Sequence, residues 1–512
     1  MMRADLPALC GCAAAVGPGR AVRARHGRRE GSRERSEARM RPIRFGTEGW
    51  RAVIAEDYTF DNVRAVARAA AAWFRQQPKR APVAVGHDTR FLAARFAAAV
   101  ADELAAAGVK PLLCAGPLPT PAICFEVVRK ELAGAVVLTA SHNPGEYNGV
   151  KVKRPEGASV MEQDAKWIEA EANRIIANPS GEWAPPQDHE RFDVREAYIE
   201  RVVSMVDTGA IRDAKLTVVA DLMHGAGIGY FDEALRRAGC ADVAVLRANP
   251  DPTFEGKHPE PIGPNLEHSV AMTGDPKVDI GVATDGDADR FGMMAHGEYI
   301  DIQRTIVYIL YHLLKNRGWR GKVMRAVNVT SMVDHLCDHF GVRVVETAVG
   351  FKNMAQALIE SPQDYLLAVE ESGGFGIRGH VPDRDGTLTA LIACEARAQE
   401  GKPVGKILED IFSLVGGRRY FDRVDLRVTP QQREALAARM HELHADKLAG
   451  RKVENVNRTD GAKLIRDDGT WLLLRLSGTE PLVRIYAEGL SADDVDSLLK
   501  AGEQLVHEAT GG

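Results

Sequence analysis

Residues 278–290 read VDIGVATDGDADR, a short apolar run that ends in a loop of alternating aspartates. The apolar run predicts a buried strand, and the loop would leave the sheet at the strand's carboxyl end. On an extended segment Asp285, Asp287 and Asp289 share one face. Three hard oxygen ligands at this spacing are typical of a Mg²⁺ site that leaves positions for water or phosphate. The alternative is an acidic surface loop, but the apolar strand before it favours the metal site.

Two further apolar runs end in polar loops of the same kind. AGAVVLTASHN (133–143) leads into TASHNP, and YLLAVEESGG (365–374) ends in EESGG. Helical patterns separate these strands from their neighbours along the chain, which is typical of parallel strands covered on both faces. Ligands bind beyond the carboxyl ends of such strands. Three similar α/β units are therefore predicted to face one cleft.

The segment after these units has a different pattern. It alternates strands expected over 423–429, 470–478 and 482–489 with helices expected over 430–447 and 491–507, which predicts a smaller C-terminal α+β domain. The expected division of the chain is a disordered Arg-rich extension over 1–40, domain I with the serine loop over 41–190, domain II with the metal loop over 191–297, domain III with the EESGG loop over 298–415, and domain IV with a phosphate-binding loop over 416–512.

The composition excludes several classes of protein. The chain has 512 residues, 45% of them hydrophobic and 27% charged, which excludes wholesale disorder and a collagen-like fibre. With 66 basic and 71 acidic residues the formal net charge is −5, so no basic excess indicates a nucleic-acid partner. No apolar run of about 18 residues predicts a membrane span. Seven cysteines without a C-x-x-C pair indicate a reducing cytoplasm.

The first forty residues differ from the rest of the chain. They hold nine arginines against four acidic residues and show no sustained helical or strand period. We expect a disordered extension, or a start codon assigned too early with Met40 as the true start. A transit peptide would be short of acids, yet Glu30, Glu34 and Glu37 lie here. A nucleic-acid-binding arm is the remaining functional alternative.

The TASHNP loop carries a candidate phosphoryl acceptor. Ser141 follows a buried strand, and the residues after it, NPG (143–145), predict a sharp turn. A helix cap is the common role of a lone serine, and the absence of G-x-S-x-G argues against a serine hydrolase. A serine that accepts and donates phosphate fits if Mg²⁺ lies beside it. Lys151, in GVKVKR, is close enough along the chain to share the site.

Two further motifs indicate sugar and phosphate binding. EESGG (370–374) combines two carboxylates, a hydroxyl and two glycines, a set that can bond vicinal sugar hydroxyls, although a capping segment is the alternative. RLSGTEPLVR (475–484) places two arginines and two hydroxyls around a glycine. Guanidinium forks with hydroxyl and backbone N–H donors hold phosphate groups, which favours a phosphate clamp over an ordinary hairpin tip.

Taken together, these motifs resemble those of the α-D-phosphohexomutase superfamily, the phosphoglucomutase/phosphomannomutase family, and most of all its bacterial phosphoglucomutases. The resemblance extends over almost all of residues 41–512. It implies four domains around a central cleft, the first three of one mixed α/β topology. The stretches that carry it are FGTEGWR (45–51), TASHNPGEYNGVKV (139–152), TDGDADRFG (284–292), GFKNM (350–354), EESGGFG (370–376) and RLSGTEPLVR (475–484).

The resemblance also implies roles for single residues. Ser141 would carry the phosphoryl group and, with Asp285, Asp287 and Asp289, coordinate one Mg²⁺ ion. Lys151 and Arg290 would assist proton transfer and bind the phosphate in transfer, and His142 would position the serine. Arg90 occupies a further motif position expected to point toward the cleft. The substrate-binding residues implied are Arg51, Lys352, Glu370, Ser372, Arg384, Arg475, Ser477, Gly478, Thr479 and Arg484.

The implied reaction interconverts glucose 1-phosphate and glucose 6-phosphate through a phosphoserine enzyme and glucose 1,6-bisphosphate, which would also serve as activator. The loop EESGGFG has Gly374 where phosphomannomutases and phosphoglucosamine mutases tend to carry a histidine, which favours glucose. Phosphomannomutase, phosphoglucosamine mutase and an Mg²⁺-dependent sugar phosphatase are the alternatives. The partners expected are a sugar phosphate, with no nucleic acid and no membrane, for a cytoplasmic monomer or homodimer.

Overall fold

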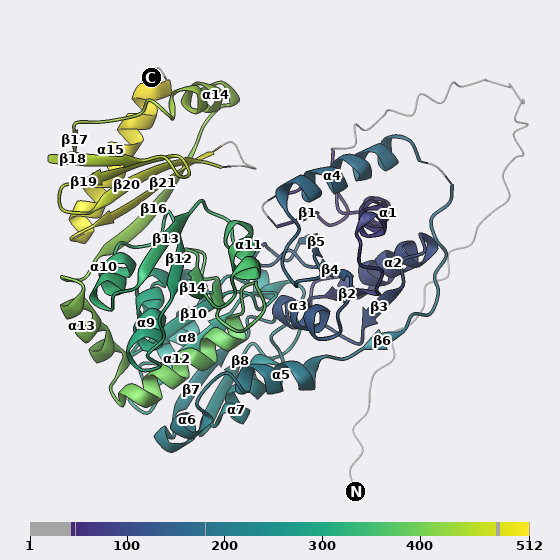
Figure 1. Ribbon diagram of the computed structural model, residues 1–512, viewed down its shortest axis with the longest axis horizontal. Helices are drawn as coiled ribbons and strands as arrows, with labels where there is room; N and C mark the ends of the chain where they lie inside the picture. Colours follow the sequence, from purple (N-terminus) through teal and green to yellow (C-terminus); the bar gives the residue numbers. More distant parts are fainter. Residues whose placement is uncertain (1–41, 47, 180, 478–481, 511–512) are drawn as a thin grey trace, which may run out of the picture. The chain divides into compact units, whose positions relative to one another are not determined.

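The computed structural model describes residues 42–510 apart from 47, 180 and 478–481. Four β-sheets follow one another along this part of the chain (Figure 1). The first three are mixed sheets flanked by helices and the last is antiparallel, which confirms the predicted α/β fold with a C-terminal α+β domain. The expected extension over 1–40 lies outside the described residues. Nowhere in the described part is a helix long and apolar enough to cross a membrane.

The first three sheets share one plan. In each, three parallel strands lie in the order third, first, second, and a fourth strand pairs antiparallel with the third. The turn between the third and fourth strands is therefore equivalent in all three domains. These strands are β2 (Val83–His87), β3 (Pro111–Cys114), β4 (Gly134–Leu138) and β5 (Tyr147–Lys153); β7 (Thr217–Asp221), β8 (Asp242–Leu246), β9 (Ile280–Thr284) and β10 (Phe291–Ala295); and β12 (Lys322–Ala326), β13 (Arg343–Thr347), β14 (Tyr365–Val369) and β15 (Phe375–Ile377).

Burial explains why these strands are apolar throughout. Every residue of β2, β4 and β9 is buried, because helices cover both faces of the sheet. The helices are α1 (Phe60–Gln76), α2 (Ala93–Ala106), α3 (Thr120–Arg129) and α4 (Glu162–Ala177); α5 (Arg195–Val203), α6 (Thr208–Ala214), α7 (Phe231–Ala238) and α8 (Glu267–Met272); and α9 (Ile302–Lys315), α10 (Met332–His339), α11 (Lys352–Glu360), α12 (Gly386–Glu400) and α13 (Val404–Leu414). Short 3₁₀ turns lie at Phe254–Gly256 and Gly263–Asn265.

Helix α12 joins the second and third domains. It follows β15 of the third sheet, yet it packs against β9 of the second sheet and against α6 and α7. Asp385 caps its first turn by accepting a hydrogen bond from the backbone N–H of Leu388 at 2.8 Å. One continuous hydrophobic core consequently includes residues of both domains, among them Val282 and Leu391.

Short edge strands extend the sheets past the expected domain boundaries. The first sheet also holds β1 (Trp50–Val53) and β6 (Arg191–Phe192), and the second also holds β11 (Glu298–Ile300). Divisions placed after residues 190 and 297 therefore each precede a strand that pairs with the earlier sheet. Strands of two or three residues are too short to carry a measurable period in the sequence.

The fourth sheet has the order β16-β21-β20-β19-β18-β17 and is covered on one face by two helices (Figure 1). The helix expected over 430–447 is wrong in its second half, because α14 (Pro430–Arg439) ends eight residues earlier. The Arg458 guanidinium donates hydrogen bonds to the carbonyls of Met440 and Leu443. These carbonyls are then not available to accept the backbone hydrogen bonds that would continue the helix. The other elements are β16 (Tyr420–Arg427), β17 (Lys447–Leu448), β18 (Arg451–Asn457), β19 (Ala462–Arg466), β20 (Trp471–Leu476), β21 (Leu482–Gly489) and α15 (Ala492–Thr510).

Candidate active site

The turn after β4 holds Ser141 against the second domain. Ser141 is buried and has φ +53°, a conformation uncommon for a residue with a Cβ, so its neighbours must hold it there. Its backbone N–H donates to Thr139 Oγ1 at 2.9 Å. Its Oγ donates to Asp285 Oδ2 at 2.9 Å and lies 3.4 Å from His142 Nδ1. The structure thus brings the predicted serine into contact with the predicted metal loop.

Arg90 supports this turn from inside the first domain. Its Nη1 donates to the carbonyls of Pro144 and Tyr147 at 2.7 and 2.9 Å, and its Nη2 donates to those of Ser141 and Asn143 at 2.7 and 2.6 Å. Its Nε donates to Asp88 at 3.1 Å. A guanidinium has five N–H donors, and these protein acceptors use all of them. The expectation that Arg90 points toward the cleft is therefore wrong, because the side chain is bound within the protein.

The turn after β9 gathers the three aspartates. Asp285, Asp287 and Asp289 are fully buried, and one ligand oxygen from each lies within 4.8 Å of the others. Asp287 Oδ1 and Asp289 Oδ1 are buried and accept no hydrogen bond. Burial, together with the two neighbouring carboxylates, holds the pKa of Asp285 well above its usual range. Buried carboxylate oxygens without a donor are costly unless a cation completes the site, so this set can hold a metal ion.

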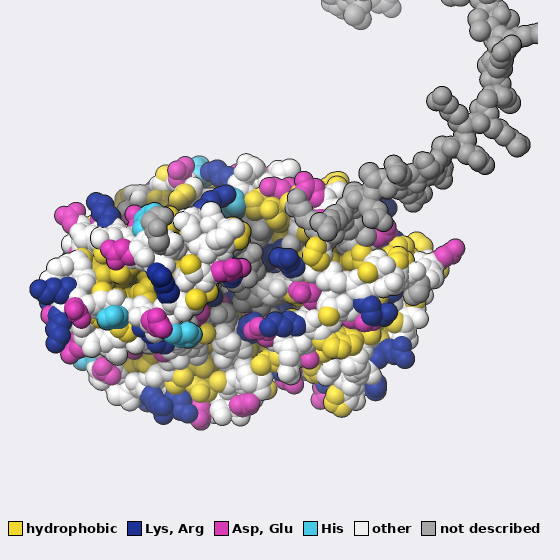
Figure 2. Space-filling model, turned by 90° about the horizontal axis from the view of Figure 1, so that it is seen from above, with side chains coloured by type: hydrophobic (Ala, Val, Ile, Leu, Met, Phe, Trp, Pro, Cys, Tyr) yellow, Lys and Arg dark blue, Asp and Glu magenta, His cyan; other side chains and the backbone are white. Residues whose placement is uncertain are grey.

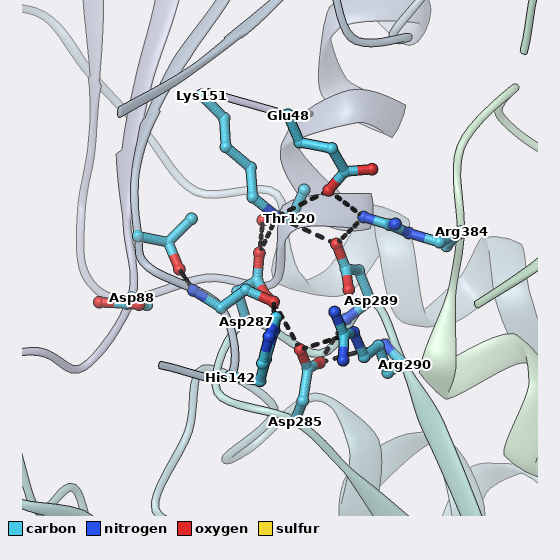
Figure 3. A network of polar contacts seen from close by, with 12 residues as sticks. Glu48, Asp88, Thr120, His142, Lys151, Asp285, Asp287, Asp289, Arg290 and Arg384 are labelled. Carbon is cyan, nitrogen blue, oxygen red and sulfur yellow. Dashed lines mark hydrogen bonds and ion pairs between the residues drawn. The ribbon is translucent and has the colours of Figure 1, made fainter. Parts of the chain in front are cut away.

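Lys151 of β5 supplies a positive charge beside this cluster (Figure 3). Its Nζ donates to Asp287 Oδ2 at 2.6 Å and to Asp289 Oδ2 at 3.0 Å, and its side chain is buried. Burial by itself would lower the pKa of Lys151, but the two aspartates outweigh it and raise the pKa above its usual value. The lysine is therefore cationic at neutral pH. Thr120, at the start of α3, donates to the same oxygen of Asp287 at 2.5 Å.

Arg290 follows the aspartates directly. Its Nη1 donates to Glu260 Oε1 at 2.9 Å, while its backbone N–H donates to Asp285 Oδ1 at 3.1 Å. His142 lies beside it, and burial and then the charges of Arg290 and Arg51 hold the pKa of His142 well below its usual range. His142 is therefore neutral at pH 7 and can share a hydrogen bond with Ser141 without adding charge. Arg51 itself donates to Asn143 Oδ1 at 2.7 Å, on the same turn.

Arg384 connects carboxylates from three domains, and Figure 3 shows its contacts with Glu48 and Asp289. Its Nη2 donates to Asp289 Oδ2 at 2.6 Å and to Glu48, and its Nη1 donates to Glu370 Oε2 at 3.1 Å. All four side chains are buried or nearly so. Burial would raise the pKa of Glu48, but Arg384 and Lys151 outweigh it and lower the pKa to about 2. Glu48 is consequently an anion throughout the physiological range.

The turn after β14 carries the predicted sugar-binding residues. Glu370 Oε1 accepts a hydrogen bond from the backbone N–H of Gly350 at 3.0 Å, and Ser372 is half-buried in the turn. At Gly374 a Cβ atom would lie 2.0 Å from Cδ of Arg384, so the arginine chain passes through the space that a side chain would need. The predicted residue Lys352 forms an ion pair with Glu162 at 3.0 Å.

In the fourth domain the predicted phosphate residues lie on neighbouring strands. Arg475 of β20 and Arg484 of β21 are direct cross-strand partners, and Asp425 of β16 lies opposite Arg484. Two like charges placed opposite each other destabilise a strand pair unless anions compensate them. Asp460 compensates the charge of Arg475, whose Nε donates a hydrogen bond to Asp460 Oδ2 at 2.7 Å. The backbone N–H of Ser477 donates to Leu482 O at 3.0 Å, and the predicted Gly478 and Thr479 lie outside the described residues.

Several residues at this site were not singled out from the sequence. Glu48 lies within FGTEGWR and could have been found from that motif. Thr120 and Glu260 lie in Pro-rich stretches that carry no chemical pattern of their own. Arg423 of β16, 3.6 Å from Glu371 beside the sugar-binding turn, alternates with other charged residues along an ordinary strand. Only the packing of distant segments brings these four to the site.

Known proteins match most of this chain. Four domain families match in order, described as phosphoglucomutase/phosphomannomutase alpha/beta/alpha domains I, II and III over residues 42–178, 196–298 and 303–415, and as the C-terminal domain over 426–501. A phosphoglucomutase/phosphomannomutase of Thermococcus kodakarensis is 31% identical over 91% of this chain and 99% of its own length.

Two further relatives carry other names. A phosphoglucosamine/phosphogalactosamine mutase of Sulfurisphaera tokodaii is 27% identical over 90% of this chain and 98% of its own length. The crystal structure of a protein described as a phosphomannomutase from Thermus thermophilus superposes with a TM-score of 0.80 at 35% identity, covering 91% of this chain and all of that one. The relatives thus agree on the fold and on the class of reaction, and their names differ in the sugar.

Proposed function

The chain belongs to the phosphoglucomutase/phosphomannomutase family, and from that premise we propose that it interconverts glucose 1-phosphate and glucose 6-phosphate. Members of this superfamily are phosphotransferase-type isomerases. The observation that carries the proposal is the contact of Ser141 Oγ with Asp285 in the aspartate cluster that Lys151 neutralises. A hydroxyl, a cation site and a fixed positive charge are the groups that phosphoryl transfer requires.

The donor set fits Mg²⁺. Its three carboxylates are hard oxygen ligands on one short turn, and two of their oxygens are buried without a hydrogen-bond donor. Asp285, Asp287 and Asp289 would hold the ion together with an oxygen on Ser141. The ion would offset negative charge on the phosphoryl group in transfer.

In the proposed reaction phospho-Ser141 donates its phosphoryl group to a free hydroxyl of the sugar monophosphate. The bond from phosphorus to the serine oxygen breaks, a bond from phosphorus to the sugar oxygen forms, and the hydroxyl proton ends on the serine oxygen. Lys151 and Arg290 would offset the charge during transfer, with Lys151 as the proposed relay of the proton. The bisphosphate then reorients and returns its other phosphoryl group to Ser141, so glucose 1,6-bisphosphate would also act as the activator.

The fourth domain would hold the phosphate that is not being transferred. Arg475 and Arg484 are opposite each other on the neighbouring strands β20 and β21, and they lie on the same sheet face as Arg423. A dianionic phosphate placed between opposed guanidinium groups removes their mutual repulsion and accepts forked hydrogen bonds. Because the sugar must bind in two orientations, this clamp has to accept a phosphate on either end of it.

The preference for glucose is proposed from the turn that follows β14. Glu370 offers a buried carboxylate for sugar hydroxyls, and Gly374 leaves its side-chain space to Arg384. Mannose phosphate is the second candidate, because the relative of known structure at 35% identity is described as a phosphomannomutase. The proposed location is the cytoplasm, since the five cysteines among the described residues are free thiols.

A coupled assay with Mg²⁺ and a trace of glucose 1,6-bisphosphate tests the proposal. Wild type, Ser141→Ala and the matched surface variant Ser497→Ala are compared on glucose 1-phosphate, mannose 1-phosphate and glucosamine 1-phosphate. Loss of the acceptor hydroxyl should reduce turnover by at least about a thousandfold, while Ser497→Ala should behave as wild type. Labelled bisphosphate should transfer phosphate to the wild-type protein and not to Ser141→Ala.

The outcomes separate the parts of the proposal. Turnover of glucose 1-phosphate that outpaces the other sugars supports the glucose assignment. A preference for mannose or glucosamine phosphate keeps the mechanism and replaces the sugar. Activity and labelling that persist in Ser141→Ala would overturn the phosphoserine mechanism.

A further inference from the structure

Glu48 contacts both cations that pair with Asp289. Its carboxylate accepts a hydrogen bond from Arg384 and lies 3.8 Å from Lys151 Nζ (Figure 3). Its side chain is 9% exposed, so solvent screens these contacts little. Within the described part of the chain, it is the one carboxylate outside the aspartate cluster that pairs with both Lys151 and Arg384. Glu370, the other carboxylate on Arg384, does not pair with Lys151.

A divalent cation bound to the aspartates would compete with Lys151 and Arg384 for the same carboxylates. Lys151 pairs with Asp287 and Asp289, and Arg384 pairs with Asp289 as well as with Glu48 and Glu370. A dication on those carboxylates withdraws their negative charge and repels both nitrogen groups, which lie within hydrogen-bond distance of the ligand side chains. A buried cation that loses its partner is costly, so each needs a carboxylate that the ion does not use. Glu48 meets that requirement for both.

We propose that Glu48 is a positioning residue that retains Lys151 and Arg384 when the divalent cation binds. In this scheme the two side chains shift their pairing from the aspartates toward Glu48, which frees the aspartate oxygens for the ion. Lys151 thereby stays beside the transferring phosphoryl group instead of competing with the ion. The inference rests on the proposed function only through the existence of the cation site.

The test measures binding of Mn²⁺ alone to the unphosphorylated full-length protein by electron paramagnetic resonance, with no sugar present. In Glu48→Gln the cations should remain on the aspartates and compete with the ion, which weakens Mn²⁺ binding by about tenfold. Glu370→Gln is the matched control, because it removes one carboxylate from Arg384 and leaves the partners of Lys151 intact. It should weaken binding by no more than about threefold.

A double-mutant cycle separates competition by Lys151 from a plain charge effect. In a Lys151→Met background the loss caused by Glu48→Gln should fall to the level of the Glu370→Gln control. Glu48→Asp keeps the charge with a shorter reach and should bind Mn²⁺ with an intermediate affinity, which preserves the test if Glu48→Gln does not fold. Circular dichroism and thermal melts check folding of each variant.

Three results would overturn the inference: wild-type affinity in Glu48→Gln, a loss no larger than in Glu370→Gln, or a loss of unchanged size in the Lys151→Met background. Wild-type protein that binds no Mn²⁺ would overturn this inference and the proposed function together. Because no sugar takes part, Mn²⁺ results as expected combined with turnover of a different sugar would support Glu48 while changing only the proposed substrate.

Discussion

At the scale of single residues, one buried guanidinium determines the shape of the serine turn. Four carbonyls of the turn accept hydrogen bonds from Arg90, and Asp88 accepts the fifth. The Phe254 ring covers the guanidinium at 4.9 Å. These contacts offset the strain of Ser141 at positive φ and aim its Oγ at Asp285.

We predict that Arg90→Lys loosens this turn. An ammonium has three donors and no planar fork, so at least two of the five acceptors lose their donor. The free energy of unfolding should fall by about 2 kcal/mol and kcat by about 10- to 100-fold. Urea unfolding and steady-state kinetics check both, with Arg174→Lys on the exposed face of α4 as the control. An Arg90→Lys variant with wild-type kcat would show that the turn keeps its shape without the fork.

We predict that Gly374→Ala displaces Arg384. The added Cβ would lie 2.0 Å from Cδ of Arg384, so the arginine must leave Glu48 and Asp289. We expect kcat/KM to fall by about tenfold or more. Gly116→Ala is the control, since no atom lies within 4 Å of its added Cβ.

A double-mutant cycle checks the cause of that loss. If Gly374→Ala acts through the arginine, it should cost little further activity in an Arg384→Ala background. Losses that simply add would contradict this account.

At the scale of elements, strand alternation places two functions on one face of the fourth sheet. On one face β19, β20 and β21 place Lys463, Trp471 and Tyr486, which pack against Val327 of the third domain. Further along β20 and β21, the same face carries Arg475 and Arg484. The period of two therefore joins an interdomain contact and the proposed phosphate clamp on one surface.

The buried Lys463 predicts a pH dependence of stability. Its Nζ donates to Val327 O at 2.7 Å and lies 4.2 Å from the Trp471 ring centroid. Burial, followed by the charge of Arg325, lowers the pKa of Lys463 to about 8. Between that value and the unfolded pKa of about 10.4 the unfolded chain binds more protons, so stability rises with pH across this window. Below the window Lys463 lowers stability by an amount that no longer changes with pH.

Relative to Lys463→Met, the wild type should therefore gain roughly 2 kcal/mol of unfolding free energy between pH 7.5 and 10. Urea unfolding of both proteins at the two pH values measures the difference. Lys452→Met, at an exposed position of β18, serves as the control. A gap between wild type and Lys463→Met that stays constant with pH would contradict the lowered pKa.

At the scale of the whole molecule, buried ion pairs tie the first domain to the third. Lys153 of β5 binds Asp383 and Ser159, and its neighbour Lys151 lies on the same face of the strand. Asp383 directly precedes Arg384, so this pair fixes the start of the segment that reaches the aspartate cluster. On the face shown in Figure 2, by contrast, basic and acidic side chains are interspersed, as on an ordinary solvated surface.

We predict that Asp383→Asn lowers the unfolding free energy by about 3 kcal/mol, because it leaves the buried Lys153 charge without its partner. The double variant Lys153→Met with Asp383→Asn should recover most of that loss. Thermal unfolding checks both, and Asp410→Asn, which breaks an exposed pair with Lys402, should leave stability nearly unchanged. A double variant as unstable as Asp383→Asn alone would contradict the unpaired-charge account.

Local patterns made much of the fold predictable. The strands before Ser141, Asp285 and Glu370 can be recognised in the sequence because burial on both faces makes them almost entirely apolar. The short strand β6 and the early end of α14 were not predictable, because pairing with the distant strand β3 and the Arg458 guanidinium determine them. Strand β11 is too short to show a period. The same holds for the candidate site. Its motifs are continuous stretches of sequence and could be predicted, whereas its ion pairs join residues from distant segments and could not.

The sequence by itself determined the four-domain α/β plan and the turns that carry the serine, the aspartates and the sugar-binding loop, because hydrophobic periodicity and turn chemistry act between near neighbours in the chain. Only the tertiary structure decided that Arg90 turns inward, that Lys352 pairs with Glu162, and that Glu48 joins Lys151 and Arg384. Those contacts join residues far apart in sequence. Their charges find partners only when separate domains have packed and excluded water.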